Sequence, residues 1–256
     1  MVGWGYQGGK ARLGKPISEV INAYIEKNDL QNYVEPFFGC GGVTRRIRAR
    51  RRVVSDMNGD LIKLWRELRD GTFTFPRSNQ IKRSEFEEFK RQNREMVESK
   101  TRIKPSATRA MYGLLCSSPY RYMDTFLEMD FGRTQKVGAH VRDGLTKMQA
   151  AAQEYLSDVE FVLPGRSYDK LPRRKNWVIY ADPPYFKTAG YHGTGQFDHE
   201  AFWRKAAEWA KQGNHVFVSY NRKPLYEARK WKLVWSKTFR GKGYERGEYL
   251  WFRALK

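Results

Sequence analysis

Residues 33–44 read YVEPFFGCGGVT, a short apolar strand that runs into a glycine-rich turn and then into an expected helix. Glycines let a ligand approach the backbone closely, and the N-terminus of a helix offers free N–H donors. This order is typical of a nucleotide-type pocket in a doubly wound α/β fold. No Gly-Lys-Ser/Thr follows the glycines, so the turn does not have the spacing of a phosphate-binding P-loop.

A second strand with an acidic end follows this turn. Residues 53–56 read VVSD, which places Asp56 at the end of an apolar run. In doubly wound folds an acidic residue at this position binds ribose hydroxyls. Asp56 could equally cap the helix expected from near Leu61, and one role does not exclude the other. Together the glycine turn and the acidic strand end predict a cofactor that carries adenosine.

A reactive tetrapeptide follows another apolar run much later in the chain. Residues 182–185 read DPPY, directly after the strand expected over 177–180. The two prolines fix φ and end the strand, so a carboxylate, a backbone carbonyl and an aromatic face are held in one place. A planar base with an exocyclic amino group needs these three partners. Asp and Pro are also common at ordinary strand exits, so only the rest of the chain decides between the two readings.

Strands alternate with helices in both outer thirds of the chain, which predicts an α/β sheet sandwiched by helices. The catalytic domain is expected to comprise residues 1–65 and 137–256, with a mostly helical target-recognition region at 66–136. The further expected elements are helices over 17–25, 137–156 and from 202, a helix capped by Ser84, strands over 161–163 and 216–221, an antiparallel pair over 231–238 and 248–255, and a mobile loop over 186–197.

The chain of 256 residues has a formal net charge of +20 and an isoelectric point near 10.0, which favours a polyanionic partner, most commonly nucleic acid. No apolar run is long enough to span a membrane, and Cys40 and Cys116 form neither a disulfide framework nor a zinc motif. We therefore expect a cytoplasmic protein without a metal. Arg50 to Arg52 are expected on a solvated face at the end of a helix. Basic and aromatic residues interleave in the middle region, and the candidates for DNA binding are Arg102, Lys104, Arg109, Tyr120, Arg121 and Arg133.

Three motifs occur in a specific order: GGK at residues 8–10, EPFFGCG at 35–41 and DPPY at 182–185. With this order the chain resembles the Dam-type (class alpha) DNA adenine-N6 methyltransferases over nearly its whole length. The resemblance implies a Rossmann-like, S-adenosylmethionine-dependent methyltransferase sheet and methylation of a flipped adenine. It implies a catalytic group of Asp182, Pro183, Pro184 and Tyr185. The cofactor contacts it implies are Tyr6, Lys10, Phe37, Phe38, Gly39, Cys40, Gly41, Asp56, Ser167, Tyr168 and Asp182.

The sequence departs from the family pattern at two places. Members often carry Trp before Ala-Gly-Gly-Lys, whereas Tyr6-Gln7 precede Gly8 here. Members also usually place Asp before an aromatic residue at the end of the fourth strand. Here residues 167–169 read SYD, so either Ser167 or a shifted Asp169 would contact the cofactor adenine. Many relatives of this kind are phage-encoded, which makes phage DNA modification or restriction–modification an expected role.

Several other activities use the same chemistry. A DPPY site could methylate N4 of cytosine, adenine in RNA, or the amide of a protein glutamine. The motif order favours DNA adenine by family resemblance, and the charge favours nucleic acid over protein. In a different class, the chain could be a non-catalytic, basic nucleic-acid-binding module on a decayed methyltransferase fold.

Overall fold

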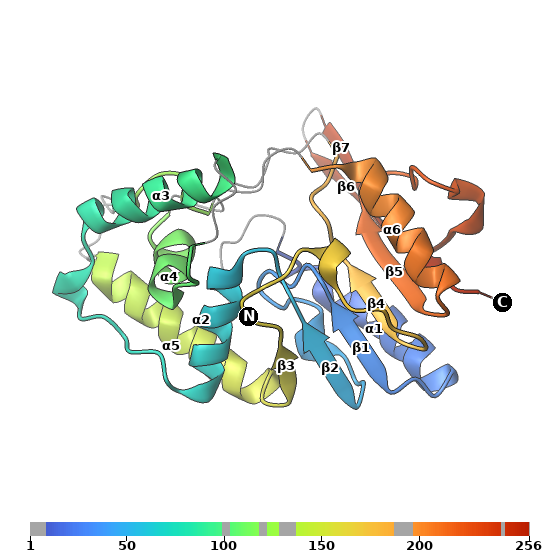
Figure 1. Ribbon diagram of the computed structural model, residues 1–256, viewed down its shortest axis with the longest axis horizontal. Helices are drawn as coiled ribbons and strands as arrows, with labels where there is room; N and C mark the ends of the chain where they lie inside the picture. Colours follow the sequence, from blue (N-terminus) through green and yellow to red (C-terminus); the bar gives the residue numbers. More distant parts are fainter. Residues whose placement is uncertain are drawn as a thin grey trace.

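The structure, a computed structural model, describes residues 9–98, 103–117, 122–127, 137–186, 197–241 and 244–255. Its centre is a seven-stranded sheet with the order β3-β2-β1-β4-β5-β7-β6 (Figure 1). The first five strands of this order pair in parallel, and β7 runs antiparallel to both β5 and β6. The strands are β1 (Asn32–Glu35), β2 (Arg51–Val54), β3 (Val159–Phe161), β4 (Val178–Ala181), β5 (His215–Tyr220), β6 (Lys232–Gly241) and β7 (Tyr244–Arg253).

The order of strands reverses at the centre of the sheet. From β1 the chain first moves outward through β2 and β3, and then returns to add β4 and β5 on the other side. The carboxyl ends of β1 and β4 therefore border the topological switch point, where doubly wound folds bind their ligands. The glycine turn follows β1 and the DPPY tetrapeptide follows β4, so the predicted α/β, Rossmann-like architecture is confirmed in this part of the chain.

Helices cover both faces of the sheet (Figure 1). On one face Ile179 and Ala181 pack with Trp203 of α6 (His199–Lys211). On the other face Tyr180 packs with Ile21 of α1 (Gly14–Lys27), as does Val178. This alternation along β4 follows from the two-residue period of a strand, and burial on both faces explains why its sequence is a continuous apolar run.

The remaining helices gather beside the β3 edge of the sheet (Figure 1). They share one core that contains Trp65, Phe86, Met111 and Leu145. The predicted boundary at residue 65 falls inside α2, and the division into two domains stays a prediction. The helices of this group are α2 (Gly59–Asp70), α3 (Arg83–Glu98), α4 (Ala107–Leu115) and α5 (Val137–Tyr155), and short 3₁₀ turns lie at Thr44–Arg46, Ser78–Gln80, Tyr168–Lys170 and Ala228–Lys230.

The helix expected after the glycine turn is absent from this described segment, which forms only the 3₁₀ turn at Thr44–Arg46. Asn22 of α1 accounts for the difference. Its side chain donates to the carbonyl of Arg46 at 2.8 Å and accepts from the N–H of Arg48 at 2.9 Å, backbone groups that a longer helix would use internally. The expectation that Arg50 to Arg52 end a helix was therefore wrong. Arg52 lies in β2, is 9% exposed, and bonds to the carbonyl of Thr44 and to Asp158.

Several element boundaries also differ from expectation. Asn58 rather than Asp56 caps α2, because its side chain accepts from the N–H of Leu61 at 3.3 Å. Ser84 lies inside α3 instead of capping it. β3 occupies residues 159–161 where 161–163 was expected, and residues 187–196 of the expected loop lie outside the described part of the chain.

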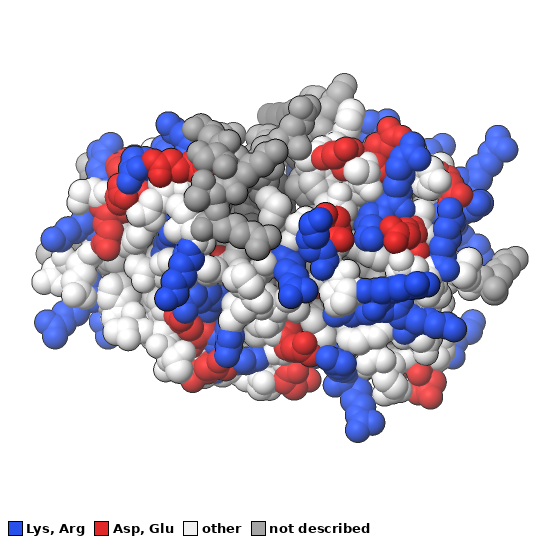
Figure 2. Space-filling view, viewed as in Figure 1, with Lys and Arg blue, Asp and Glu red and all other residues white. Residues whose placement is uncertain are grey.

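Figure 2 shows Lys and Arg scattered across this face of the molecule, with Asp and Glu among them. The net charge alone therefore does not single out a DNA-binding face in this view. No helix among the described residues is long and apolar enough to cross a membrane.

Candidate active site

Three charged side chains from distant parts of the chain meet at the end of β4. Lys10, which lies just before α1, places its Nζ 2.6 Å from both carboxylate oxygens of Asp182. The same Nζ lies 3.7 Å from Oε1 of Glu248 in β7. The side chains of Lys10, Asp182 and Glu248 are 8%, 13% and 6% exposed. The fold thus brings the first and third sequence motifs together in a nearly dry cluster.

Tyr185 completes the cluster. Its hydroxyl donates to Oε1 of Glu248, and the Nζ of Lys10 lies 4.8 Å from the centre of its ring. The ring also packs edge-on against Tyr220, with 5.7 Å between centroids. These contacts fix the direction of an aromatic side chain that is 8% exposed.

The electrostatics follow from one cation between two buried carboxyl groups. Burial lowers the pKa of Lys10, but the carboxylates of Asp182 and Glu248 raise it more, so Lys10 stays charged. Burial raises the pKa of Asp182, and the Lys10 ammonium offsets only part of that effect. Burial likewise raises the pKa of Glu248. The Lys10 ammonium, shared between the two buried carboxyl groups, therefore stabilises this cluster.

A carboxylate also holds the glycine turn. Asp56 accepts from the backbone N–H of Gly39 at 2.9 Å with one oxygen and from that of Asn58 at 2.9 Å with the other. Gly39 and Gly41 have φ values of 52° and 64°, which favour glycine. Burial raises the pKa of Asp56, while the backbone N–H donors oppose this rise. Asp56 thus lies against the turn, and its predicted role in binding the cofactor ribose stays a prediction.

The neighbouring aromatic residues of the turn point to different places. Phe37 stacks with Tyr168, with 5.4 Å between ring centroids and 27° between planes. Phe38 instead packs edge-on against Trp65 and Phe161 in the helical core and is 2% exposed. Phe37 therefore contacts Tyr168, another predicted cofactor residue. The Phe38 side chain instead anchors the turn to the helical core.

The other predicted cofactor residues lie around this surface. Cys40 is half-buried against the helical core, and burial raises the pKa of its thiol to about 12, so it is neutral. Ser167 is half-buried at the start of the 3₁₀ turn that contains Tyr168. The Asp169 carboxylate is 44% exposed and lies 3.4 Å from the ammonium of Lys170. The choice between Ser167 and Asp169 stays open, and Tyr6 lies outside the described residues.

Two functional candidates escaped the sequence analysis. Glu248 lies 63 residues beyond Tyr185, and no local pattern marks it. Glu35 ends the apolar strand β1 and is 3% exposed; this isolated charge was an available signal. Its Oε2 accepts from the hydroxyl of Tyr33 at 2.9 Å and from both the N–H and the hydroxyl of Thr44. Burial raises the pKa of Glu35 to about 8.

The residues predicted to contact DNA fall into three groups: one is buried, one is exposed, and the others lie outside the described residues. Arg109 was wrongly expected at the DNA surface: it is 3% exposed, and its guanidinium binds both oxygens of the buried Asp60, one at 2.7 Å. Lys104 is exposed as expected. Two further arginines, not predicted from the sequence, are exposed beside the tetrapeptide: Arg222 lies 4.4 Å from the ring centre of Phe186, and Arg246 lies 5.9 Å from that of Tyr185. Arg102, Tyr120, Arg121 and Arg133 lie outside the described residues.

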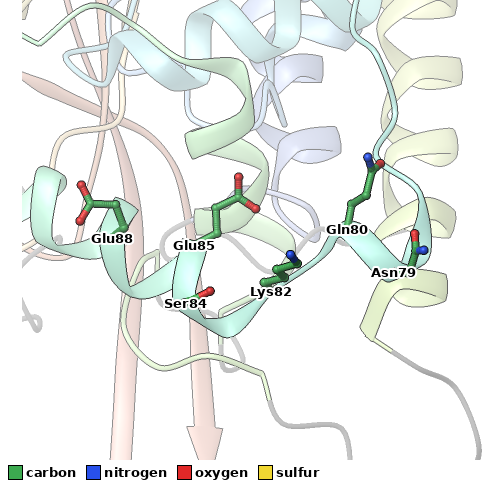
Figure 3. A pocket seen from close by; sticks show the side chains of 6 residues that line it. All are labelled: Asn79, Gln80, Lys82, Ser84, Glu85 and Glu88. Atoms are coloured by element: carbon green, nitrogen blue, oxygen red, sulfur yellow. The ribbon is translucent and has the colours of Figure 1, made fainter.

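A separate pocket of about 660 Å³ opens on the helical part of the molecule (Figure 3). The loop before α3 and the first turns of α3 line it with Asn79, Gln80, Lys82, Ser84, Glu85 and Glu88. It contains no residue of the glycine turn or of the tetrapeptide. Within the described ranges, no group of three or more His, Cys, Asp or Glu could hold a metal ion.

The sequence matches a known protein family over most of its length. Residues 6–238 match the family model described as D12 class N6 adenine-specific DNA methyltransferase. Among solved structures, SMU.472, which is described as a methyltransferase and is complexed with SAH, has 11% sequence identity and a TM-score of 0.34. That match covers 97% of this chain and 55% of the other, so this chain spans about half of its length. A comparison with curated proteins gave no match. Since the family model covers most of the sequence, the protein belongs to the D12 class N6 adenine-specific DNA methyltransferases.

Proposed function

We propose that the protein transfers the methyl group of S-adenosylmethionine to N6 of an adenine that is flipped out of double-stranded DNA and held at residues 182–185. The observation that carries this proposal is the pairing of Lys10 with Asp182. An ammonium donates to both oxygens of a buried carboxylate beside an aromatic ring. An exocyclic amino group offers the same kind of donor, and the adjacent Tyr185 ring offers a surface on which a base stacks.

The second half of the site would hold the cofactor. The glycine turn lets a ligand approach the backbone, and Asp56 offers carboxylate oxygens beside it for ribose hydroxyls. Phe37 and Tyr168 add a stacked aromatic surface next to the same turn. These residues fit a nucleoside with a ribose and a planar base. S-adenosylmethionine supplies an electrophilic methyl group on a sulfonium.

The protein's part in the reaction is to make a weak nucleophile available. The lone pair of the adenine amino nitrogen is delocalised into the ring. Asp182 and the carbonyl of Pro183 accept its two N–H bonds, which draws the nitrogen toward tetrahedral geometry. Tyr185 stacks on the base, and the gain in rate comes from orientation and electrostatics in a site that excludes water. Asp182 then accepts the proton that the methylated nitrogen releases.

DNA binding must offset the cost of extruding the base, about a few kcal/mol. Arg222 and Arg246 are exposed beside the rings of Phe186 and Tyr185, where phosphates that flank the flipped nucleotide would lie. They therefore join Lys104 as candidates for phosphate contacts. Arg102, Tyr120, Arg121 and Arg133 remain candidates on sequence grounds.

The variant Asp182→Ala tests the proposal. Methyl transfer from labelled S-adenosylmethionine to unmethylated DNA should fall by about 10²-fold or more, because the amino group loses its acceptor. DNA binding in a gel-shift assay should survive. Asp143→Ala is the matched control, since it removes an exposed carboxylate from α5. A wild-type protein that binds DNA but neither binds S-adenosylmethionine nor transfers methyl would instead be the non-catalytic binding module.

A further inference from the structure

Lys10 occupies the acceptors that the proposed reaction needs. Both oxygens of Asp182 lie 2.6 Å from its Nζ. Each carboxylate oxygen can accept a second hydrogen bond, but an ammonium that contacts both oxygens fills the space in front of the carboxylate where we place the adenine amino group. The structure therefore shows the site with Lys10 in place of the base, and docking of adenine requires the ammonium to move.

The surroundings restrict where the ammonium can go. Lys10 is 8% exposed, and a charge that leaves its partner in such a place is costly unless another partner receives it. Among the described residues, Glu248 is the second acid within ion-pair distance, with Oε1 at 3.7 Å from Nζ. The Tyr185 ring, 4.8 Å from Nζ, lines the same space and tolerates a cation at its face.

Glu248 is itself held in place. It lies in the paired part of β7, in register with Lys237 of β6, and its side chain is 6% exposed. The hydroxyl of Tyr185 donates to the oxygen that faces Lys10. A carboxylate fixed in this way keeps its position whether or not the ammonium is bound to it.

We propose that Glu248 is a positioning residue that receives the Lys10 ammonium from Asp182 when the target base docks. The inference rests on the proposed function, because the base is what displaces the lysine. The hand-over clears the Asp182 carboxylate for the one N–H that it accepts and keeps the buried cation paired throughout. Glu248 also holds Tyr185 in the orientation in which the base would stack, so one side chain serves both parts of the base pocket.

The first test uses the free protein and needs no DNA. A crystal structure of Asp182→Asn should show the Lys10 ammonium moved onto Glu248, because the amide removes the charge of the first partner. The expected distance from Nζ to a Glu248 oxygen is about 2.8 Å, a normal charge-assisted hydrogen bond. A lysine that stays on the new amide side chain at position 182, or that turns to solvent, would overturn the proposal.

The second test is kinetic and covers the case in which Asp182→Asn does not fold. Glu248→Gln keeps an oxygen for the Tyr185 hydroxyl but removes the charge that receives Lys10. Its single-turnover methylation of unmethylated DNA should fall by about tenfold or more, while its affinity for S-adenosylmethionine stays unchanged. Glu245→Gln is the matched control: it makes the same change on the same strand, where the exposed Glu245 pairs with Arg240.

The outcomes separate this inference from the proposed function. Equal rates for Glu248→Gln and Glu245→Gln would overturn the hand-over while leaving adenine methylation intact. A wild-type protein that methylates no DNA would overturn the proposed function, and the position of Lys10 in Asp182→Asn would still decide whether Glu248 can receive the ammonium.

Discussion

The backbone N–H of Gly39 donates to Oδ2 of Asp56 at 2.9 Å, which joins the carboxyl end of β1 to that of β2. The other oxygen of Asp56 accepts from Asn58, directly before α2. One carboxylate thus fixes the glycine turn relative to the next strand and helix. The predicted cofactor pocket depends on the shape of this turn as much as on the side chains around it.

Gly41→Ala should disrupt the turn. Gly41 has a φ of 64°, and an added Cβ would lie 2.8 Å from the ring of Phe38. We expect a loss of about 2–4 kcal/mol in the free energy of unfolding, from left-handed strain plus overpacking, and weaker binding of S-adenosylmethionine. Gly71→Ala is the control, since its φ is 69° but its nearest neighbour would lie at 3.7 Å. Calorimetry that finds equal cofactor affinity in both variants would contradict this prediction.

Glu35 should make stability depend on pH. Its pKa is about 8 in the folded protein, against an ordinary value of 4.5, so the folded state retains a proton that the unfolded state has lost. The free energy of unfolding should therefore fall as the pH rises from 4.5 to about 8, by up to about 1.4 kcal/mol per pH unit. Glu35→Gln should make this fall smaller, because an amide does not titrate, while the buried Asp56, Asp182 and Glu248 still contribute. If the free energy of urea unfolding changed with pH in the same way in the wild type and in Glu35→Gln, this prediction would be wrong.

Arg109→Met should destabilise the fold. The change leaves the carboxylate of Asp60, which is 4% exposed, without its guanidinium partner. The expected loss is about 3–5 kcal/mol in thermal or urea unfolding. Lys104→Met, on the exposed side of the same segment, should change stability by less than about 0.5 kcal/mol and should weaken DNA binding. A stable Arg109→Met protein with impaired DNA binding would restore the role predicted from sequence.

Arg222→Ala and Arg246→Ala should each weaken DNA binding in a salt-dependent way. A lost phosphate contact lowers the slope of log K against log salt by about 1. Arg48→Ala is the control. Arg48 is exposed and pairs with Glu26 at 2.6 Å. It lies near the start of β2, whereas the tetrapeptide follows the carboxyl end of β4. Unchanged slopes for both site variants, measured by fluorescence anisotropy, would exclude phosphate contacts by these residues.

The sequence predicted those parts of the fold that depend on local patterns. The apolar period of α1 and the buried runs of β4 and β5 are read directly from consecutive residues. Because the glycine turn and the tetrapeptide each follow a parallel strand, both lie at the carboxyl ends of the strands. The alternation of strand residues could also have separated Phe37 from Phe38, because neighbours at a strand end face opposite sides.

Local patterns did not predict contacts between residues that are far apart in the sequence. Arg109 looks like any basic residue of the middle region until Asp60 is seen beside it, 49 positions away. Glu248 enters the site only because β7 pairs between β5 and β6. Asn22 of α1 captures backbone groups that the glycine turn's expected helix would have used. In each case a long-range hydrogen bond or ion pair decides the outcome, and a single sequence does not contain its geometry.

The most direct measurement is transfer of labelled methyl from S-adenosylmethionine to unmethylated DNA, followed by nucleoside analysis of the product. We expect label in N6-methyladenine, lost in Asp182→Ala and retained in Asp143→Ala. Label in N4-methylcytosine would keep the cofactor site but contradict the assigned base. No label in DNA, with no label in RNA or protein substrates either, would contradict the proposed methyltransferase function.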